Sequence, residues 1–208
     1  MPAWFIVFEG GEGSGKSTVS AAIATRLRGL GRTVVHTREP GGTRAGELVR
    51  QLLHEPLTPW AELFAFLVAR AQLVEEVVAP ALARGDTVLC DRFSPSTFAY
   101  QVHARGLDAT AVRLANAFAT GGLEPGLVVY LDIDPEVGLR RKHGETEAIR
   151  TGLEDLEFHR KVREGYIAQA EADRDRWLVV DASLPLEKVV ERVWAGIEAR
   201  LTGAALEP

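Results

Sequence analysis

The feature that most limits how this chain can fold is a glycine-rich stretch near its start, Gly10–Ser17. It matches the pattern G-x-x-x-x-G-K-[ST], with the apolar run Trp4–Phe8 before it and a segment of helical spacing, Lys16–Leu30, after it. This strand–loop–helix order is the setting that the pattern requires. Glycines let backbone N–H groups turn inward around phosphate oxygens, and the start of a helix adds partial positive charge. We therefore predict a phosphate-binding loop between a strand and a helix.

The loop pattern also predicts individual roles. Lys16 is expected to reach the β- and γ-phosphates of a nucleoside triphosphate, and the Ser17 hydroxyl to ligate Mg²⁺. The residues predicted to bind the nucleotide phosphates are Gly10, Gly11, Glu12, Gly13, Ser14, Gly15, Lys16, Ser17 and Thr18. The competing interpretation is a flexible glycine turn that joins a strand to a helix and binds nothing.

Short apolar runs alternate with longer segments of helical spacing along the chain. The predicted strands are Trp4–Phe8, Thr33–His36, Thr87–Cys90, Leu127–Leu131 and Trp177–Val180. The predicted helices are Lys16–Leu30, Arg44–His54, Trp60–Arg84, Asp108–Thr120, Leu153–Arg174 and Leu186–Leu201. Such alternation predicts an α/β fold: one domain whose parallel sheet of five strands is covered by helices on both faces. Trp60–Arg84 is apolar on more than one side, which favours cover by the sheet and by a partner subunit.

Composition excludes several other classes of protein. The 208 residues include 24 Lys and Arg against 29 Asp and Glu, a formal net charge of −5, and 46% are hydrophobic. This hydrophobic content is too high for a disordered chain, and the acidic balance disfavours a nucleic-acid-binding protein. Cys90 is the single cysteine, so no disulfide can form within the chain. The longest apolar run, Leu63–Ala69, is too short to cross a membrane, and Met1–Trp4 does not resemble a signal peptide. We expect a cytoplasmic protein without membrane or nucleic-acid partners.

Two further strand ends carry arginines. Arg38 follows the second predicted strand, and Asp91 and Arg92 follow the third. The carboxyl ends of parallel strands share one edge of the sheet, so both guanidinium groups are expected beside the phosphate loop, where they can hold a second phosphate. Asp91 is then placed as a carboxylate associated with Mg²⁺. An ordinary ion pair is the alternative for either arginine taken alone.

At this point the chain resembles the bacterial-type thymidylate kinases, a family of P-loop nucleoside monophosphate kinases. The stretches that carry the resemblance are Phe8–Thr18, Thr37–Thr43 (T-R-E-P-G-G-T), Ala61–Arg70, Asp91–Gln101 and, in the second half, Phe158–Tyr166. The resemblance implies the three-layer P-loop NTPase fold with a short lid. It also implies transfer of the ATP γ-phosphate to dTMP with Mg²⁺, and a homodimer.

The resemblance assigns residues to the acceptor. It implies that Arg38 and Arg92 hold the dTMP phosphate, that Phe66 stacks on thymine and that Arg70 hydrogen-bonds a base carbonyl. Phe66 and Arg70 are four residues apart, so one helix face can carry both, although plain core packing also explains Phe66. The full implied acceptor set is Arg38, Phe66, Arg70, Arg92, Ser96, Thr97, Tyr100 and Gln101.

The remaining assignments concern the transfer itself. The resemblance implies that Glu12 turns toward the acceptor sugar and an arginine, while exposure to solvent is the alternative. The predicted lid is Gly138–Gly152, where Arg141 and Arg150 are the candidates for a catalytic arginine and a solvated charged loop is the alternative. Asp181 is expected beside adenine, or in a turn without a ligand. The predicted catalytic set is Lys16, Glu12, Arg38, Arg92, Arg141 and Arg150.

Three rival functions stay open from the residues. A nucleotide-dependent switch is disfavoured because the single asparagine, Asn116, does not begin an N-K-x-D stretch. A deoxynucleoside kinase acts on a neutral hydroxyl and has less use for paired arginines. Another nucleoside monophosphate kinase differs only in the base that it accepts.

Overall fold

The structure is a computed structural model that describes the backbone of residues 3–143 and 145–203 and the side chains of residues 3–142 and 156–200. Five parallel strands form one sheet in the order β2-β3-β1-β4-β5. The strands are β1 (Trp4–Gly10), β2 (Val34–Arg38), β3 (Thr87–Asp91), β4 (Leu127–Asp132) and β5 (Trp177–Asp181). All described strand pairings are parallel, so the predicted parallel sheet is confirmed.

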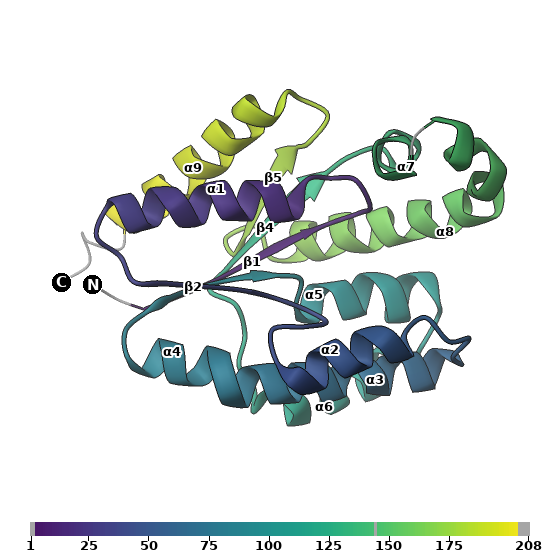
Figure 1. The fold of residues 1–208 in the computed structure, drawn as a ribbon, viewed down its shortest axis with the longest axis horizontal. Helices are drawn as coiled ribbons and strands as arrows, with labels where there is room; N and C mark the ends of the chain where they lie inside the picture. Colours follow the sequence, from purple (N-terminus) through teal and green to yellow (C-terminus); the bar gives the residue numbers. More distant parts are fainter. Residues whose placement is uncertain (1–2, 144, 204–208) are drawn as a thin grey trace.

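Helices cover both faces of this sheet (Figure 1). Their bounds are α1 (Lys16–Gly29), α2 (Arg44–Leu52), α3 (Pro59–Leu73), η1 (Val74–Val78), α4 (Ala79–Ala83), α5 (Ser94–Thr97), η2 (Phe98–Ala104), α6 (Ala109–Thr120), α7 (Pro135–His143), α8 (Glu145–Ala172) and α9 (Leu186–Gly203). Helices α1 and α9 pack on one face, whereas α3, η1, α4, η2 and α8 pack on the other. The three-layer fold is the one expected from the alternation in sequence.

The alternation of side chains along β1 divides the core in two. Ile6 and Phe8 face the layer of α1 and α9, and Phe5 and Val7 face the layer that contains η1. All four side chains are buried, as is Cys90 on the neighbouring strand. Residues in a strand point to opposite faces in turn, so a strand covered on both sides needs an apolar run, which β1 has from Phe5 to Phe8.

The predicted helix Trp60–Arg84 is one continuous helical segment, α3–η1–α4, whose middle is π-helical. Pro80 explains the widened turns, because proline has no N–H to donate to the carbonyl four residues earlier and its ring crowds that carbonyl. The wider turn accommodates the proline without ending the helix.

Two helical stretches lie where no helix was predicted. Segments α5 and η2 follow β3 directly, and α7 occupies the start of the predicted lid Gly138–Gly152. Asp134 starts α7, because its Oδ1 accepts a hydrogen bond from the Glu136 N–H at 2.9 Å and Pro135 is the first helical residue. Helix α8 begins at Glu145, earlier than the predicted Leu153, so the described backbone of the predicted lid is helical in α7 and again from Glu145.

The first turns of α7 rest directly on the phosphate loop. A Cβ atom at Gly13 would overlap the carbonyl oxygen of Gly138, and a Cβ atom at Gly138 would overlap the carbonyl oxygen of Glu12. The two backbones therefore touch where neither residue has a side chain.

Among the described residues, no helix is both long and apolar enough to cross a membrane.

Candidate active site

The phosphate loop joins the end of β1 to the start of α1. The Lys16 ammonium lies inside it and donates hydrogen bonds to the carbonyl oxygens of Gly10 at 2.9 Å and Gly11 at 2.8 Å. Burial, with the positive charge of Arg92 added, lowers the pKa of Lys16 to about 7. Phosphate oxygens bound nearby would favour the protonated form of Lys16 and then attract its positive charge.

The Ser17 hydroxyl and the Asp91 carboxylate meet beside this loop, with Ser17 Oγ donating to Asp91 Oδ2. Asp91 ends β3 and pairs with Phe8 of β1, which is why the two oxygens lie close together. Mg²⁺ usually takes one or two protein oxygens and completes its octahedron with phosphate oxygens and waters. The pair therefore fits a Mg²⁺ ion held jointly with a bound triphosphate.

Glu12, in the loop itself, is clamped between two cations. Its Oε1 lies 3.6 Å from Arg92 Nη2, and its Oε2 lies 2.5 Å from Lys142 Nζ. Burial alone would raise the pKa of Glu12, but the hydrogen bond from Lys142 and the charge of Arg92 outweigh it and lower the pKa. Lys142 is a site residue that was not predicted, although the basic run around Arg141 was its signal.

Arg92 makes several contacts beside the phosphate loop, in the region where the acceptor was predicted to bind. Its backbone has a φ of 72°, a left-handed conformation that is uncommon for residues with side chains. The guanidinium donates to Ser96 Oγ at 3.0 Å, Tyr166 Oη at 3.2 Å and Tyr100 Oη at 3.3 Å, and lies 5.1 Å from the Tyr100 ring centroid. These contacts fix the position of its charge beside the loop.

A buried carboxylate supports Arg92 from below. Glu9 is fully buried, and it accepts hydrogen bonds from the Phe93 N–H at 2.9 Å, Ser96 Oγ at 2.6 Å and Tyr166 Oη at 2.8 Å. Burial raises the pKa of Glu9, and the charge of Arg92 opposes that shift. Tyr166 and Glu9 were not predicted as site residues, because only the fold brings α8 and β1 together here.

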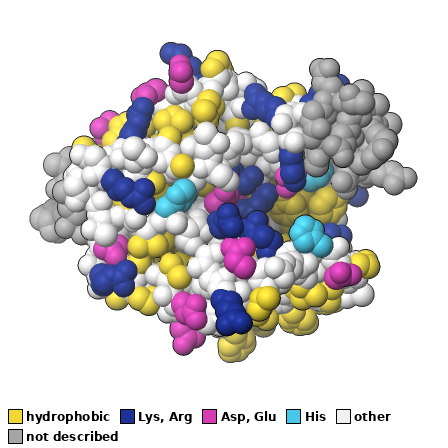
Figure 2. All heavy atoms as spheres, viewed as in Figure 1, with side chains coloured by type: hydrophobic (Ala, Val, Ile, Leu, Met, Phe, Trp, Pro, Cys, Tyr) yellow, Lys and Arg dark blue, Asp and Glu magenta, His cyan; other side chains and the backbone are white. Residues whose placement is uncertain are grey.

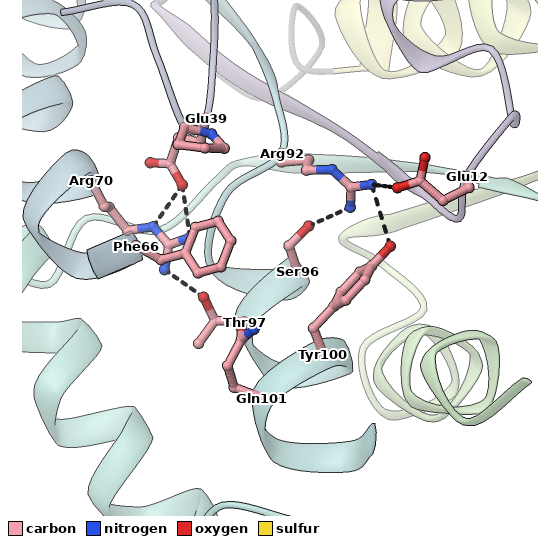
Figure 3. Close-up of a pocket in the computed structure, with 10 residues that line it drawn as sticks. Glu12, Glu39, Phe66, Arg70, Arg92, Ser96, Thr97, Tyr100 and Gln101 are labelled. Atoms are coloured by element: carbon pink, nitrogen blue, oxygen red, sulfur yellow. Dashed lines mark hydrogen bonds and ion pairs between the residues drawn. The ribbon is translucent and has the colours of Figure 1, made fainter. Parts of the chain in front are cut away.

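A cavity of about 170 Å³ opens beside Arg92 (Figure 3). The predicted acceptor residues that line it are Phe66, Arg70, Arg92, Ser96, Thr97, Tyr100 and Gln101. Glu12, Glu39 and Pro40 line it too, and the last two were not predicted. Phe66 and Arg70 both face this cavity from α3, so a flat ring and a cation share one wall.

The two predicted phosphate-binding arginines do not line the same cavity. Arg38 ends β2 and faces a second cavity of about 450 Å³ together with Ser17 and Asp91. Its guanidinium lies 3.1 Å from the Glu47 carboxylate, and more than half of its side chain is exposed.

Of the two arginines predicted in the lid, Arg141 holds a neighbouring turn of the backbone. Arg141 donates to the carbonyl oxygens of Ala182 at 2.8 Å and Ser183 at 3.1 Å, so it holds the turn after β5. Asp181 shapes the same turn by accepting from the Ser183 N–H at 2.9 Å. The side chain of Arg150, within α8, lies outside the described residues.

Positive charge is concentrated around these cavities. Figure 2 shows Lys and Arg side chains gathered near the middle of one face, with Asp and Glu side chains beside them. An acidic chain thus presents a small basic region, which suits a phosphorylated small molecule better than a nucleic-acid backbone.

Comparison with known proteins gives a consistent result. A family model described as thymidylate kinase matches residues 8–193. The chain is 48% identical to a thymidylate kinase of Synechococcus sp., covering 98% of this chain and 100% of the relative, and 45% identical to one of Deinococcus radiodurans, covering 94% and 97%. A crystal structure of thymidylate kinase from Ehrlichia chaffeensis has a TM-score of 0.74 at 32% identity, covering 86% of this chain and 93% of that one.

Proposed function

This chain belongs to the thymidylate kinase family, and we propose which of its residues carry out the transfer from ATP to dTMP. It is a nucleoside monophosphate kinase whose phosphate donor is ATP. The observation that carries the assignment is Glu12, which links the phosphate loop to Arg92, the arginine at the acceptor cavity. The donor and acceptor sites thereby meet at one residue.

We assign the donor phosphates to the loop and Lys16. The backbone N–H groups of the loop and of the start of α1 are expected to donate to the phosphate oxygens. Ser17 and Asp91 are assigned to Mg²⁺, which when bound would neutralise charge between the β- and γ-phosphates. Lys16 is expected to leave the carbonyl oxygens of Gly10 and Gly11 for these phosphates, and its pKa then rises.

The acceptor needs no general base. The dTMP phosphate is already an anion, so one of its oxygens bonds to the γ-phosphorus as the bond from that phosphorus to the β–γ bridging oxygen breaks, leaving ADP. The barrier is repulsion and alignment between anions, and positioned cations lower it. We assign Arg92 to the acceptor phosphate, with Arg38 joining it after release from Glu47.

Thymine is assigned to the cavity beside Arg92. Phe66 supplies a ring face for stacking and Arg70 a donor for a base carbonyl, while Tyr100 stands between the base and phosphate sides. Ser96, Thr97 and Gln101 complete the walls. We further propose that residues 1–208 form one kinase domain, which is supported by the single sheet that joins all five strands. We also propose that the enzyme acts in the cytoplasm.

A panel of acceptors tests this function. With ATP and Mg²⁺, a coupled assay for ADP release should respond to dTMP and lose its signal when EDTA removes the metal. The comparison acceptors are dUMP, dCMP, dAMP, dGMP and thymidine. Transfer to thymidine instead of dTMP would establish a deoxynucleoside kinase, and ATP binding without transfer would favour a switch protein.

We propose that two copies of the chain pair through α2, α3 and α6. These helices carry most of the large hydrophobic side chains that stay exposed: Leu48, Leu52, Trp60, Phe64, Val68, Leu114 and Phe118. They lie together at the lower edge of Figure 1, where Figure 2 shows hydrophobic side chains. A contiguous apolar face of this kind usually marks a protein interface.

Phe118→Glu is expected to dissociate the proposed dimer. Phe118 is 87% exposed in the single chain, and a carboxylate placed between two apolar faces would be buried without a partner. Analytical ultracentrifugation should show a dimer for the wild type and a monomer for the variant. Leu30→Glu is the matched control, because Leu30 is 57% exposed at the end of α1, outside this face. A monomeric wild type at micromolar concentration would contradict the proposal.

A further inference from the structure

Arg70 is held more completely than recognition of a base by itself requires. Its side chain is 1% exposed, and its Nε and Nη2 atoms both donate to Glu39 Oε2, at 2.9 and 2.7 Å. Its Nη1 donates to Thr97 Oγ1 at 2.9 Å and to Asn116 Oδ1 at 2.7 Å. A guanidinium has five N–H groups, so within the described part of the chain these bonds leave one N–H on Nη2 without an acceptor.

The grip of Glu39 alone leaves the guanidinium a way to turn. Both hydrogen bonds from Arg70 end on the same oxygen, Oε2, while Oε1 is buried without a partner among the described residues. A two-oxygen fork fixes a guanidinium plane, whereas one shared oxygen is a single point about which it can swing. The plane is fixed by the acceptors on Nη1 together with the Phe93 ring, whose centroid lies 5.1 Å from Arg70 Cζ.

Asn116 supplies one of those acceptors from a helix that does not line the base cavity. It lies on α6, is 3% exposed and is the single asparagine of the chain. Its neighbours on the same helix, Leu114 and Phe118, point outward and are exposed. An amide inside a helix gains nothing from helix propensity, so its buried contact with Arg70 is the interaction that distinguishes this position.

We propose that Asn116 is a positioning residue for recognition of the acceptor base. It fixes the guanidinium plane of Arg70 so that the remaining N–H on Nη2 faces a carbonyl oxygen on the pyrimidine edge. Asn116 itself touches no substrate. This inference rests on the proposed function, because it takes the cavity of Arg70 as the site of the base.

The proposal separates the oxygen of Asn116 from its shape. Asn116→Leu keeps the size and removes the acceptor, and it is expected to raise KM for dTMP about tenfold, as the loss of one charge-assisted hydrogen bond would. The kcat and the KM for ATP are expected to stay within about twofold, because the phosphate loop is untouched. Asn116→Asp keeps an acceptor oxygen and is expected to retain a KM for dTMP within about threefold of the wild type.

Thr120→Val is the matched control. Thr120 lies one turn further along α6, is 4% exposed, and its Oγ1 has no hydrogen-bond partner among the described residues. This variant makes the same kind of polar-to-apolar exchange in the same helix without touching Arg70. Its KM for dTMP is expected to equal that of the wild type.

A second measurement reports on the base itself. The nucleotide 5-methyl-dCMP has the shape of dTMP, but an amino group replaces the carbonyl oxygen that Arg70 is expected to contact. The preference of the wild type for dTMP, as a ratio of kcat/KM values, should fall about tenfold in Asn116→Leu, since a misplaced donor no longer distinguishes the two groups. If Asn116→Leu does not fold, Asn116→Ala takes its place in both assays.

The outcomes separate cleanly. A wild type that does not phosphorylate dTMP overturns the proposed function itself. With an active wild type, the inference is overturned by an unchanged KM in Asn116→Leu, by an equal effect of Thr120→Val, or by a rise in KM that leaves the base preference unchanged. A larger loss in Asn116→Asp than in Asn116→Leu would also overturn it, because it would show that shape and neutrality matter and the oxygen does not.

Discussion

Replacing Lys16 by methionine is expected to lower kcat by about a thousandfold, the scale on which positioned cations act in phosphoryl transfer. Methionine keeps the length of the side chain but cannot neutralise the oxygens of the γ-phosphate. The fold should survive, because Lys16 in the wild type is buried and its pKa is already lowered to about 7. Steady-state kinetics with saturating ATP and dTMP measure the effect, and thermal unfolding checks the fold.

Proton uptake gives this variant a readout that a general loss of activity would not produce. At pH 8 most Lys16 side chains in the free protein are neutral, since the pKa is about 7. Phosphate oxygens raise that pKa, so ATP binding should take up a proton and weaken as the pH rises above 7. Calorimetry in buffers of different ionisation enthalpy should detect the uptake in the wild type and in the control Lys161→Met, which alters an exposed residue of α8, but not in Lys16→Met. Equal uptake in all three proteins would assign the proton to another group.

Replacing Arg92 by alanine is expected to lower kcat/KM for dTMP by about a thousandfold, with a much smaller effect on KM for ATP. The variant loses the cation for the acceptor phosphate and also leaves the carboxylates of Glu9 and Glu12 without it. The loss of Arg92 removes an attraction for the dTMP phosphate, and the two uncompensated carboxylates repel it. Initial rates at varied dTMP and fixed saturating ATP measure the change.

Arg92→Lys separates charge from geometry. Lysine restores one positive charge but not the planar fork that reaches Ser96 and Tyr100 together, so only part of the loss should be recovered. Arg176→Ala serves as the control for loss of an arginine, because Arg176 pairs with Asp173 in a different cavity. An Arg92→Ala variant with normal kinetics and a lower melting temperature would limit Arg92 to a structural role.

Most of the strands could be predicted because they contain an uninterrupted apolar run, as β1, β3 and β4 do. Val7 and Phe8 face opposite layers, and both layers are buried, so this part of β1 is apolar on both sides. Lys16–Leu30 was predictable for the complementary reason that it follows the phosphate loop and ends near glycines. These patterns lie within short stretches of sequence, so they do not depend on contacts with distant residues.

Segments α5 and η2 could not be predicted, because the group that starts them is far away in sequence. The Glu9 carboxylate accepts from the N–H groups of Phe93 and Ser96, and so satisfies the free donors at the start of α5. No short-range pattern around Ser94–Ala104 shows that a residue of β1 will be there. Tyr166 could not be predicted for a similar reason, because it is far from Glu9 in the sequence and only the fold brings the two side chains together.

The predicted site divides along a similar line. Residues that were predicted because they lie in a sequence motif, such as Phe66 and Tyr100, do line the cavity beside Arg92. Long side chains were harder to place, because a guanidinium reaches whichever carbonyl or carboxylate folding brings near. Arg38 therefore lies against Glu47 and Arg141 against the turn at Ala182, while Lys142 is the lid residue that reaches Glu12.

The close backbone contact between Gly13 and Gly138 couples the position of the phosphate loop to that of the start of α7. Neither residue can gain even a methyl group without pushing the two backbones apart, so the two positions are constrained jointly, although they are remote in sequence. Lys142 lies one turn beyond Gly138 on the same helix, and its ammonium pairs with Glu12 of the loop. A change in the loop on nucleotide binding would therefore reach Lys142 in two ways, through the backbone contact at Gly138 and through the ion pair with Glu12.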